Sequence, residues 1–168
     1  MQRTKWIERK FTFDFPEGWM FNIIERLRGT PARIDWITAG LGEAELTFVP
    51  EGKWSIKEIL QHVIDAERVF AYRSLTFARK DNNTLPSFDE KDYAANSNGN
   101  NRAWHELVEE FKALRKSTEL LFNSFTKENL NAIGKASDYT ITVLALGYII
   151  VGHVAHHINI IRERYLTI

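Results

Sequence analysis

The chain has 168 residues, 44% of them hydrophobic and 26% charged, and its 22 basic side chains balance its 22 acidic ones. A globular chain of this length buries enough surface for one core, so we expect a single domain over residues 1–168 with little disorder. Zero net charge removes the attraction to phosphates on which duplex binding depends. We therefore expect neither nucleic acid nor a membrane surface as a partner.

The sequence contains no cysteine. This excludes disulfides, cysteine-ligated zinc, iron–sulfur clusters and a cysteine nucleophile. Residues 1–6 are charged and do not begin an apolar run of signal-peptide length. The most apolar stretch, residues 143–151, is shorter than a membrane span. We therefore expect a soluble protein of the cytoplasm.

Residues 1–15 are predicted to form an extended N-terminal arm. Phe11, Phe13 and Phe15 alternate with polar residues, and this period of two is typical of a strand. No second convincing strand is predicted to pair with it, and a lone strand is not stable by itself. We therefore expect the arm to pack its three rings onto the rest of the protein.

A first helix is predicted over residues 17–41, because apolar side chains recur there at helical spacing. Gly29 interrupts this pattern. Thr30 and Pro31 then read as a new N-cap followed by proline at the first helical position. We therefore expect the helix to be broken or kinked near Gly29.

The second helix has the clearest start signal. Ser55 followed three residues later by Glu58 is a capping box, in which each side chain can bond to the backbone of the other residue. The apolar period then continues to about Arg79. The polar residues 81–100 that follow form a long connection, and such connections in compact domains often carry function.

Two further helices complete the pattern. The third is predicted over residues 101–124, and the fourth begins after the N-cap Thr142 and ends near Tyr165. Residues 126–139 between them are predicted to form a turn or a short helical turn. Four amphipathic helices indicate an all-α four-helix bundle over residues 16–166.

The fourth helix is apolar on nearly all sides and must therefore be covered on more than one of them. A central position in the bundle would cover it, and so would an interface between two copies of the chain. We expect both to contribute, and the chain is thus predicted to form a homodimer.

Four of the five histidines lie in apolar helical stretches, where an imidazole costs free energy unless its nitrogens find partners. His153 and His157 are four residues apart, which places both rings on one face of the fourth helix. His62 can reach this pair if the second and fourth helices lie side by side. Three histidine ligands leave a position open for water or substrate, as in catalytic metal sites.

Other interpretations of these histidines remain open. A histidine on an apolar helix face is often a core residue that bonds to a neighbour. His156 could pair with His153 in place of His157, but it points about 100° away from His157, so the three rings of this helix cannot all converge. His105 begins the third helix in a polar turn and is expected at the surface.

The sequence resembles the DinB/YfiT-like superfamily of bacterial four-helix bundles. The resemblance covers about residues 17–165 and is carried by four segments: residues 5–11, residues 25–33, residues 54–67 with His62 among them, and residues 152–157. The resemblance implies one metal ligand from the second helix and two, four residues apart, from the last. These carry over to His62, His153 and His157, with zinc or nickel as the metal, and the resemblance also implies a homodimer.

The activity that the resemblance implies is a metal-dependent transferase that activates a low-molecular-weight thiol, or water, at the three-histidine site. A metal-dependent hydrolase is the first alternative, and a non-enzymatic, stress-related metal-binding dimer is the second. The substrate is expected to be a small molecule.

Few other residues suggest a catalytic role. Asp65 follows His62 by three residues and could orient a ligand or accept a proton. Glu67 is expected to form a solvated pair with Arg68. Three arginines are weak candidates for binding an anionic thiol or substrate: Arg73, Arg115 and Arg162.

Overall fold

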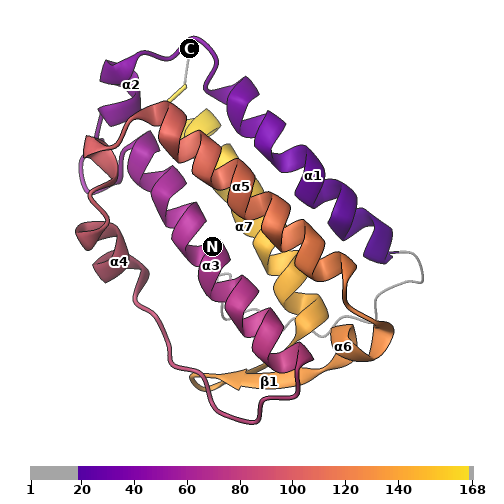
Figure 1. Ribbon diagram of the computed structural model, residues 1–168. Coiled ribbons are helices and arrows are strands. Elements are labelled where there is room, and N and C mark those ends of the chain that lie inside the picture. Colours follow the sequence, from indigo (N-terminus) through magenta and orange to yellow (C-terminus); the bar gives the residue numbers. More distant parts are fainter. Residues whose placement is uncertain (1–18, 167–168) are drawn as a thin grey trace, which may run out of the picture.

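Four long helices dominate the computed structural model, which describes the backbone of residues 19–166 and the side chains of residues 23–166. The long helices are α1 (Trp19–Ile37), α3 (Ile56–Ala78), α5 (Trp104–Asn123) and α7 (Val143–Arg164) (Figure 1). The expected all-α four-helix bundle is thus confirmed. The predicted arm, residues 1–15, lies outside the described residues.

The long helices form a ring in the order α1, α5, α3, α7. Both α1 and α3 pack against α5 and α7, so that α1 and α3 lie across the bundle from each other. Helices α3 and α5 run in the same direction, and α7 runs against α3 (Figure 1). The first half of α3 therefore lies beside the second half of α7.

The start signals of α3 and α7 are confirmed. The Ser55 side chain accepts a hydrogen bond from the Glu58 amide at 3.1 Å, and the Glu58 carboxylate accepts from the Ser55 amide at 2.8 Å. The Thr142 side chain accepts from the Ala145 amide at 3.1 Å. These caps satisfy amide groups that the first helical turn leaves without intrahelical partners.

The first helix is not broken near Gly29, because α1 continues through Thr30 and Pro31, and the alternative, a kink at this place, stays a prediction. The Thr30 hydroxyl donates to the Arg26 carbonyl, one turn earlier in the same helix. Proline removes one amide donor from a helix but leaves the chain helical when packing holds it in place. Here Leu27 and Ile34 are both buried on either side of the proline.

The long connection between α3 and α5 returns along α3. It contains α4 (Glu90–Asn96) and the 3₁₀ turn η2 (Gly99–Asn101). An Arg73 guanidinium N–H donates to the Pro86 carbonyl at 2.8 Å near the start of this connection. Near its end, the buried Lys57 ammonium donates to the Arg102 carbonyl at 2.8 Å, which fixes the start of α5 beside the start of α3.

Several short elements of the fold were not predicted as such, among them α4 and η2 of the long connection. Helix α2 (Glu43–Thr47) lies between α1 and α3. Helix α6 (Lys127–Asn131) fits the helical turn expected within residues 126–139, but the antiparallel strands β1 (Ile133–Ala136) and β2 (Tyr139–Thr142) that follow it were not predicted.

The hairpin closes the end of the bundle against α3. A Cβ atom added to Gly134 would lie 1.9 Å from the Phe77 ring, so only glycine lets β1 approach this buried ring. Leu85 of the long connection adds a parallel bridge to Ala136.

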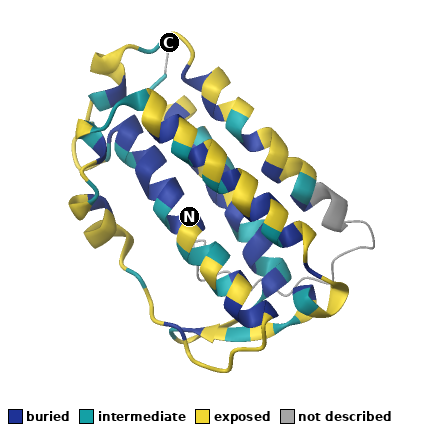
Figure 2. Cartoon of the chain, viewed as in Figure 1, coloured by how far each residue is buried: buried dark blue, intermediate teal, exposed yellow. Residues whose placement is uncertain are grey.

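Buried side chains line the inner faces of all four long helices (Figure 2). Helix α7 supplies buried residues along most of its length, because it packs against both α1 and α3. By length and composition alone, α7 is also apolar enough to cross a membrane. The sequence-based prediction that no stretch is long enough for this considered only residues 143–151 and left out the rest of the helix. Core helices of soluble proteins meet the same criterion, and in the bundle α7 packs against both α1 and α3.

Candidate metal centre

The structure brings together the three histidines that the sequence singled out. His62 lies two turns into α3, and His153 and His157 lie at and just after the middle of α7, beside it. The His153 Nε2 atom is 3.0 Å from Nε2 of His62 and 3.1 Å from Nε2 of His157. One nitrogen from each residue lies within 4.8 Å of the others.

Hydrogen bonds alone cannot account for both short distances from the His153 Nε2 atom. A neutral imidazole nitrogen carries either a hydrogen or a lone pair, so the single Nε2 atom of His153 makes at most one well-aligned hydrogen bond. Across the other short contact, two lone pairs or two N–H groups would then point at each other, which is unfavourable. A cation between the three nitrogens removes this conflict, because it accepts a lone pair from each.

Burial keeps the three imidazoles neutral. His62, His153 and His157 are 3%, 8% and 9% exposed. Burial lowers the pKa of His62 to about 4, and burial together with the neighbouring His62 and His156 lowers the pKa of His157 to about 3. The pKa of His153 is also well below its usual value, for the same reasons. At neutral pH each lone pair is therefore available to a metal ion.

The spacing fits a transition metal. Imidazole nitrogens about 2.1 Å from a shared ion, at angles between octahedral and tetrahedral, lie about 3.0–3.4 Å apart. The two short distances of the cluster, 3.0 and 3.1 Å, fall in that range. No carboxylate belongs to the cluster in the described part of the chain. A metal held by three histidines keeps at least one position open.

Aromatic rings surround the cluster. The Trp54 ring lies 4.9 Å from the His62 ring, and the Phe70 ring lies 6.2 Å from that of His153, edge to face. The Tyr165 hydroxyl donates to the Trp54 carbonyl and so ties the end of α7 to the chain just before α3. These rings lower the local polarity, which strengthens the interaction of a cation with its ligands.

The other two histidines lie outside the cluster. His156 is exposed, and its ring centre is 5.3 Å from that of His157. The alternative pairing of His153 with His156 is thus not the one that the structure shows. His105 is exposed at the start of α5, as expected.

Asp65 lies among polar partners on another side of α3. Its carboxylate accepts from the Gln61 side chain at 3.0 Å and lies 3.6 Å from the Arg68 guanidinium. Burial raises the pKa of this carboxyl group, against the effect of Gln61 and Arg68. The structure therefore does not bring Asp65 into the histidine cluster, and its catalytic role stays a prediction.

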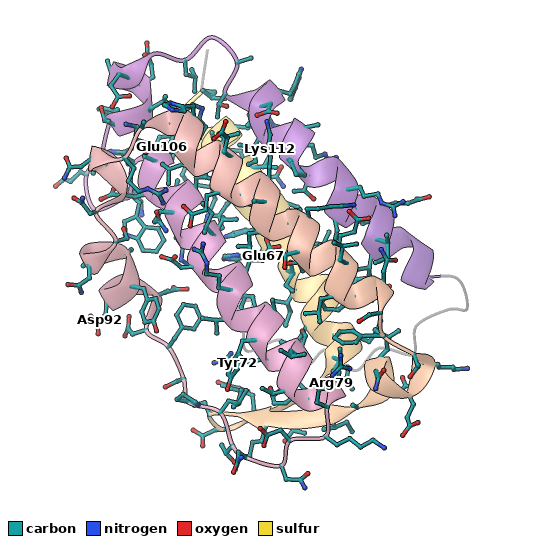
Figure 3. The ribbon with its side chains drawn as sticks, in the orientation of Figure 1. Glu67, Tyr72, Arg79, Asp92, Glu106 and Lys112 are labelled. Atoms are coloured by element: carbon teal, nitrogen blue, oxygen red, sulfur yellow. The ribbon has the colours of Figure 1, made fainter. Side chains whose placement is uncertain are left out.

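The sequence interpretation missed a buried ion pair. Glu67 does not form a solvated pair with Arg68 but lies in the interior with Arg115, and both side chains are 2% exposed (Figure 3). The Arg115 Nη2 atom is 2.7 Å from Glu67 Oε2, and its guanidinium carbon lies 5.1 Å from the centre of the Phe111 ring. The helical period could have revealed Glu67, since it falls between the buried positions Val63 and Ser74.

Known proteins give an independent view of the fold. The model of the DinB superfamily matches residues 26–161. The structure of YfiT from Bacillus subtilis, described as "a probable metal-dependent hydrolase with an unusual four-helix bundle topology", superposes with a TM-score of 0.77. The match covers 93% of each chain at 17% sequence identity. No curated protein sequence matches the chain significantly. The family match spans most of the sequence and contains all three histidines, and the chain therefore belongs to the DinB superfamily.

Proposed function

We propose that His62, His153 and His157 hold one divalent transition metal, zinc or nickel, and that the protein is a transferase acting on a small thiol. The observation that carries this proposal is the close approach of three buried, neutral imidazoles, which each bring one nitrogen within 4.8 Å of the others. Such a metal would lower the pKa of a thiol or water bound at its open position. The protein supplies the neutral ligands, the dry surroundings and the open side.

A thiol suits this cluster better than water does. A thiol has a free pKa of about 8.5, so little further help is needed to deprotonate it near neutral pH. Attack by water usually requires a nearby general base as well. The carboxylate nearest in sequence, Asp65, is engaged with Gln61 and Arg68. In the proposed reaction the thiol releases its proton to solvent and its sulfur forms a bond to an electrophilic carbon. The bond from that carbon to the leaving group breaks, and the leaving group departs with the electron pair of that bond.

Hydrolysis is the second candidate, and the structural likeness to YfiT is the observation that favours it. That protein is described as a probable metal-dependent hydrolase. A hydrolase built on the same three histidines would cleave an ester or amide without any thiol. The two candidates therefore differ in their requirement for a co-substrate.

Metal content, measured by plasma mass spectrometry, tests the site itself. We expect about one transition metal per wild-type chain and almost none in His153→Ala, which removes one of three ligands. His156→Ala is the matched control, since His156 lies on the same helix but is exposed. Wild-type protein that stays metal-free after incubation with Zn²⁺ or Ni²⁺ at pH 7 would contradict the proposed site.

Turnover of the metal-loaded protein tests the reaction. We expect thiol-dependent loss of the electrophile 1-chloro-2,4-dinitrobenzene in the presence of a small thiol, and no such loss with His153→Ala. Cleavage of 4-nitrophenyl acetate without thiol would instead support the hydrolase. Metal binding with neither activity, across a panel of thiols and esters, would favour the non-enzymatic role.

A further inference from the structure

Arg73 stands apart from the other arginines of the protein. It is half-buried on α3, and burial lowers the pKa of its guanidinium. Its hydrogen bond to the Pro86 carbonyl engages one of five N–H donors. The two other arginines of the described residues that are not exposed both pair with carboxylates: Arg102 with Glu110 and Arg115 with Glu67. Arg73 has no such carboxylate within the described part of the chain.

A guanidinium that is partly desolvated without a counter-charge is unfavourable unless something else offsets the cost. Helix α4 begins close to this region with three acidic residues, which could in principle have supplied the charge: Asp89, Glu90 and Asp92. None of them forms an ion pair with Arg73. Asp89 instead caps α4 through the amides of Lys91 and Asp92, and Asp92 points away from the bundle (Figure 3).

A strip of aromatic rings joins Arg73 to the histidine cluster. Phe70 precedes Arg73 by three residues, so both lie on the same side of α3. The Phe70 ring lies 6.2 Å from the ring of His153 and 6.4 Å from that of Phe88, which in turn lies 5.2 Å from Tyr93. Phe88 follows Pro86, the partner of Arg73, by two residues. The rings therefore run from the cluster toward the segment that contains Pro86, the hydrogen-bond partner of Arg73.

The length of this strip sets the size of a ligand. His62 and Arg73 are eleven residues apart on α3, which separates their Cα atoms by about 16 Å, and the length of the arginine side chain leaves the guanidinium on the order of 10–16 Å from the cluster. A ligand the size of an extended tripeptide spans about 10 Å. The planar guanidinium of arginine is suited to a carboxylate, which it can bind through two N–H groups.

We infer that Arg73, Phe70 and Phe88 form a subsite for a small carboxylate-bearing thiol, with the carboxylate at Arg73 and the sulfur at the three-histidine cluster. This inference rests on the proposed function and specifies its co-substrate. The aromatic rings contact the body of the ligand, and Arg73 selects anionic thiols over neutral ones of similar size.

The test uses the cobalt-loaded full-length protein, because a thiolate that binds Co²⁺ produces a charge-transfer absorption in the near ultraviolet. The probes are glutathione, its diethyl ester, which lacks the carboxylate charges, and 2-mercaptoethanol, which reaches the metal only. The variants are Arg73→Gln and Arg73→Lys. The matched control is Arg79→Gln, at the exposed end of the same helix (Figure 3).

We expect Arg73→Gln to weaken the binding of glutathione about tenfold, the size of one charge-assisted contact. Arg73→Lys should have an intermediate effect, and Arg79→Gln should have none. Binding of 2-mercaptoethanol should change less than twofold in all variants, and the diethyl ester should bind wild type about as weakly as glutathione binds Arg73→Gln. Equal affinities of wild type and Arg73→Gln for glutathione would overturn the inference, and so would an equal loss for all three probes.

Failure of the proposed function has a different signature. In that case cobalt binds, but none of the thiols produces the charge-transfer absorption. Calorimetric titration with S-methylglutathione, which keeps the carboxylates and cannot form a thiolate, then tests the subsite alone. Binding that Arg73→Gln abolishes supports a carboxylate subsite at Arg73, whereas no binding to wild type overturns it.

Discussion

Two groups of buried polar side chains lie in the same bundle, and the contrast between them separates structure from function. Glu67 and Arg115 carry opposite charges, lie 2.7 Å apart and come from the adjacent helices α3 and α5. The three histidines are chemically alike, come from the adjacent helices α3 and α7, and converge through atoms of the same kind. The two charges of the ion pair balance each other. In the histidine cluster, by contrast, hydrogen bonds alone cannot account for both short contacts of the His153 Nε2 atom.

This difference indicates which group needs a ligand. The buried ion pair balances its two charges within the chain, although it adds little net stability because both charges lose their hydration and most of their polar atoms have no hydrogen-bond partner among the described residues. A cluster of neutral imidazoles can instead present one lone pair from each ring to a cation. The helix α3 carries one member of each group, so that substitutions in a single helix can test the contrast.

The largest effect is expected from breaking the ion pair. Glu67→Gln leaves the Arg115 charge buried without compensation, and we expect a loss of about 3–5 kcal/mol in the free energy of unfolding. The double variant Glu67→Leu/Arg115→Met removes both charges and should recover most of this loss. Urea unfolding of the single and double variants measures both values. A single variant as stable as wild type would show that the pair carries no buried charge.

The second effect is the stabilisation by metal. Zn²⁺ at a free concentration 100 times its dissociation constant should raise the free energy of unfolding by about 2.7 kcal/mol. His157→Ala should abolish this increase, whereas Glu67→Leu/Arg115→Met should retain it, since that pair does not ligate. Thermal unfolding with and without Zn²⁺ makes the comparison, and an increase that persists in His157→Ala would argue against the three-histidine site.

The third effect is a loss of stability of the metal-free protein in acid. The pKa of His62 is about 4 in the folded chain and about 6.5 when unfolded. Between these values the unfolded chain binds the extra proton, so stability is fully present above about pH 6.5 and falls as the pH is lowered toward 4. The loss for His62 at pH 5 is about 2 kcal/mol.

Denaturant unfolding at pH 7 and pH 5 measures this loss. His62→Leu should reduce the difference between the two pH values, whereas the exposed His105→Gln should leave it unchanged. A wild-type protein equally stable at both pH values would contradict the assignment of neutral, buried imidazoles.

The smallest effect is expected at Gly152, next to His153 on α7. This residue is exposed, and an added Cβ would meet no atom of the described residues within 4 Å. Gly152→Ala should therefore stabilise the helix by about 0.5–1 kcal/mol and leave metal content unchanged.

Sedimentation of the same variant also tests the proposed homodimer, because a weakened dimer would mean that a second copy approaches α7 at Gly152.

The sequence was sufficient for features that depend on local pattern. The capping residues Ser55 and Thr142 and the limits of α3 and α7 follow from side chains near each other along the chain. The four-residue spacing of His153 and His157 placed them on one face. The approach of His62 was a conditional prediction, since it required α3 and α7 to be neighbours, and the fold satisfies that condition.

Features that depend on distant contacts were not predictable in this way. Proline inside α1 is tolerated because Leu27 and Ile34 are buried. The residues next to Pro31 in the sequence do not indicate that packing. Strand β1 lacks an alternating pattern, and its glycine is required by Phe77, which lies far away in sequence. Glu67 has Arg68 as its neighbour in sequence, and only the packing of α3 against α5 reveals Arg115 as its partner.

The distance along the chain between His62 and His153, 91 residues, has a consequence for synthesis on the ribosome. At about 5–20 residues per second, His62 emerges roughly 5–20 s before the other two histidines. A nascent chain therefore cannot assemble the three-histidine cluster until at least 91 residues beyond His62 have been made. Under the proposed function, an ion held by all three histidines would report that α3 and α7 have both been made and folded together.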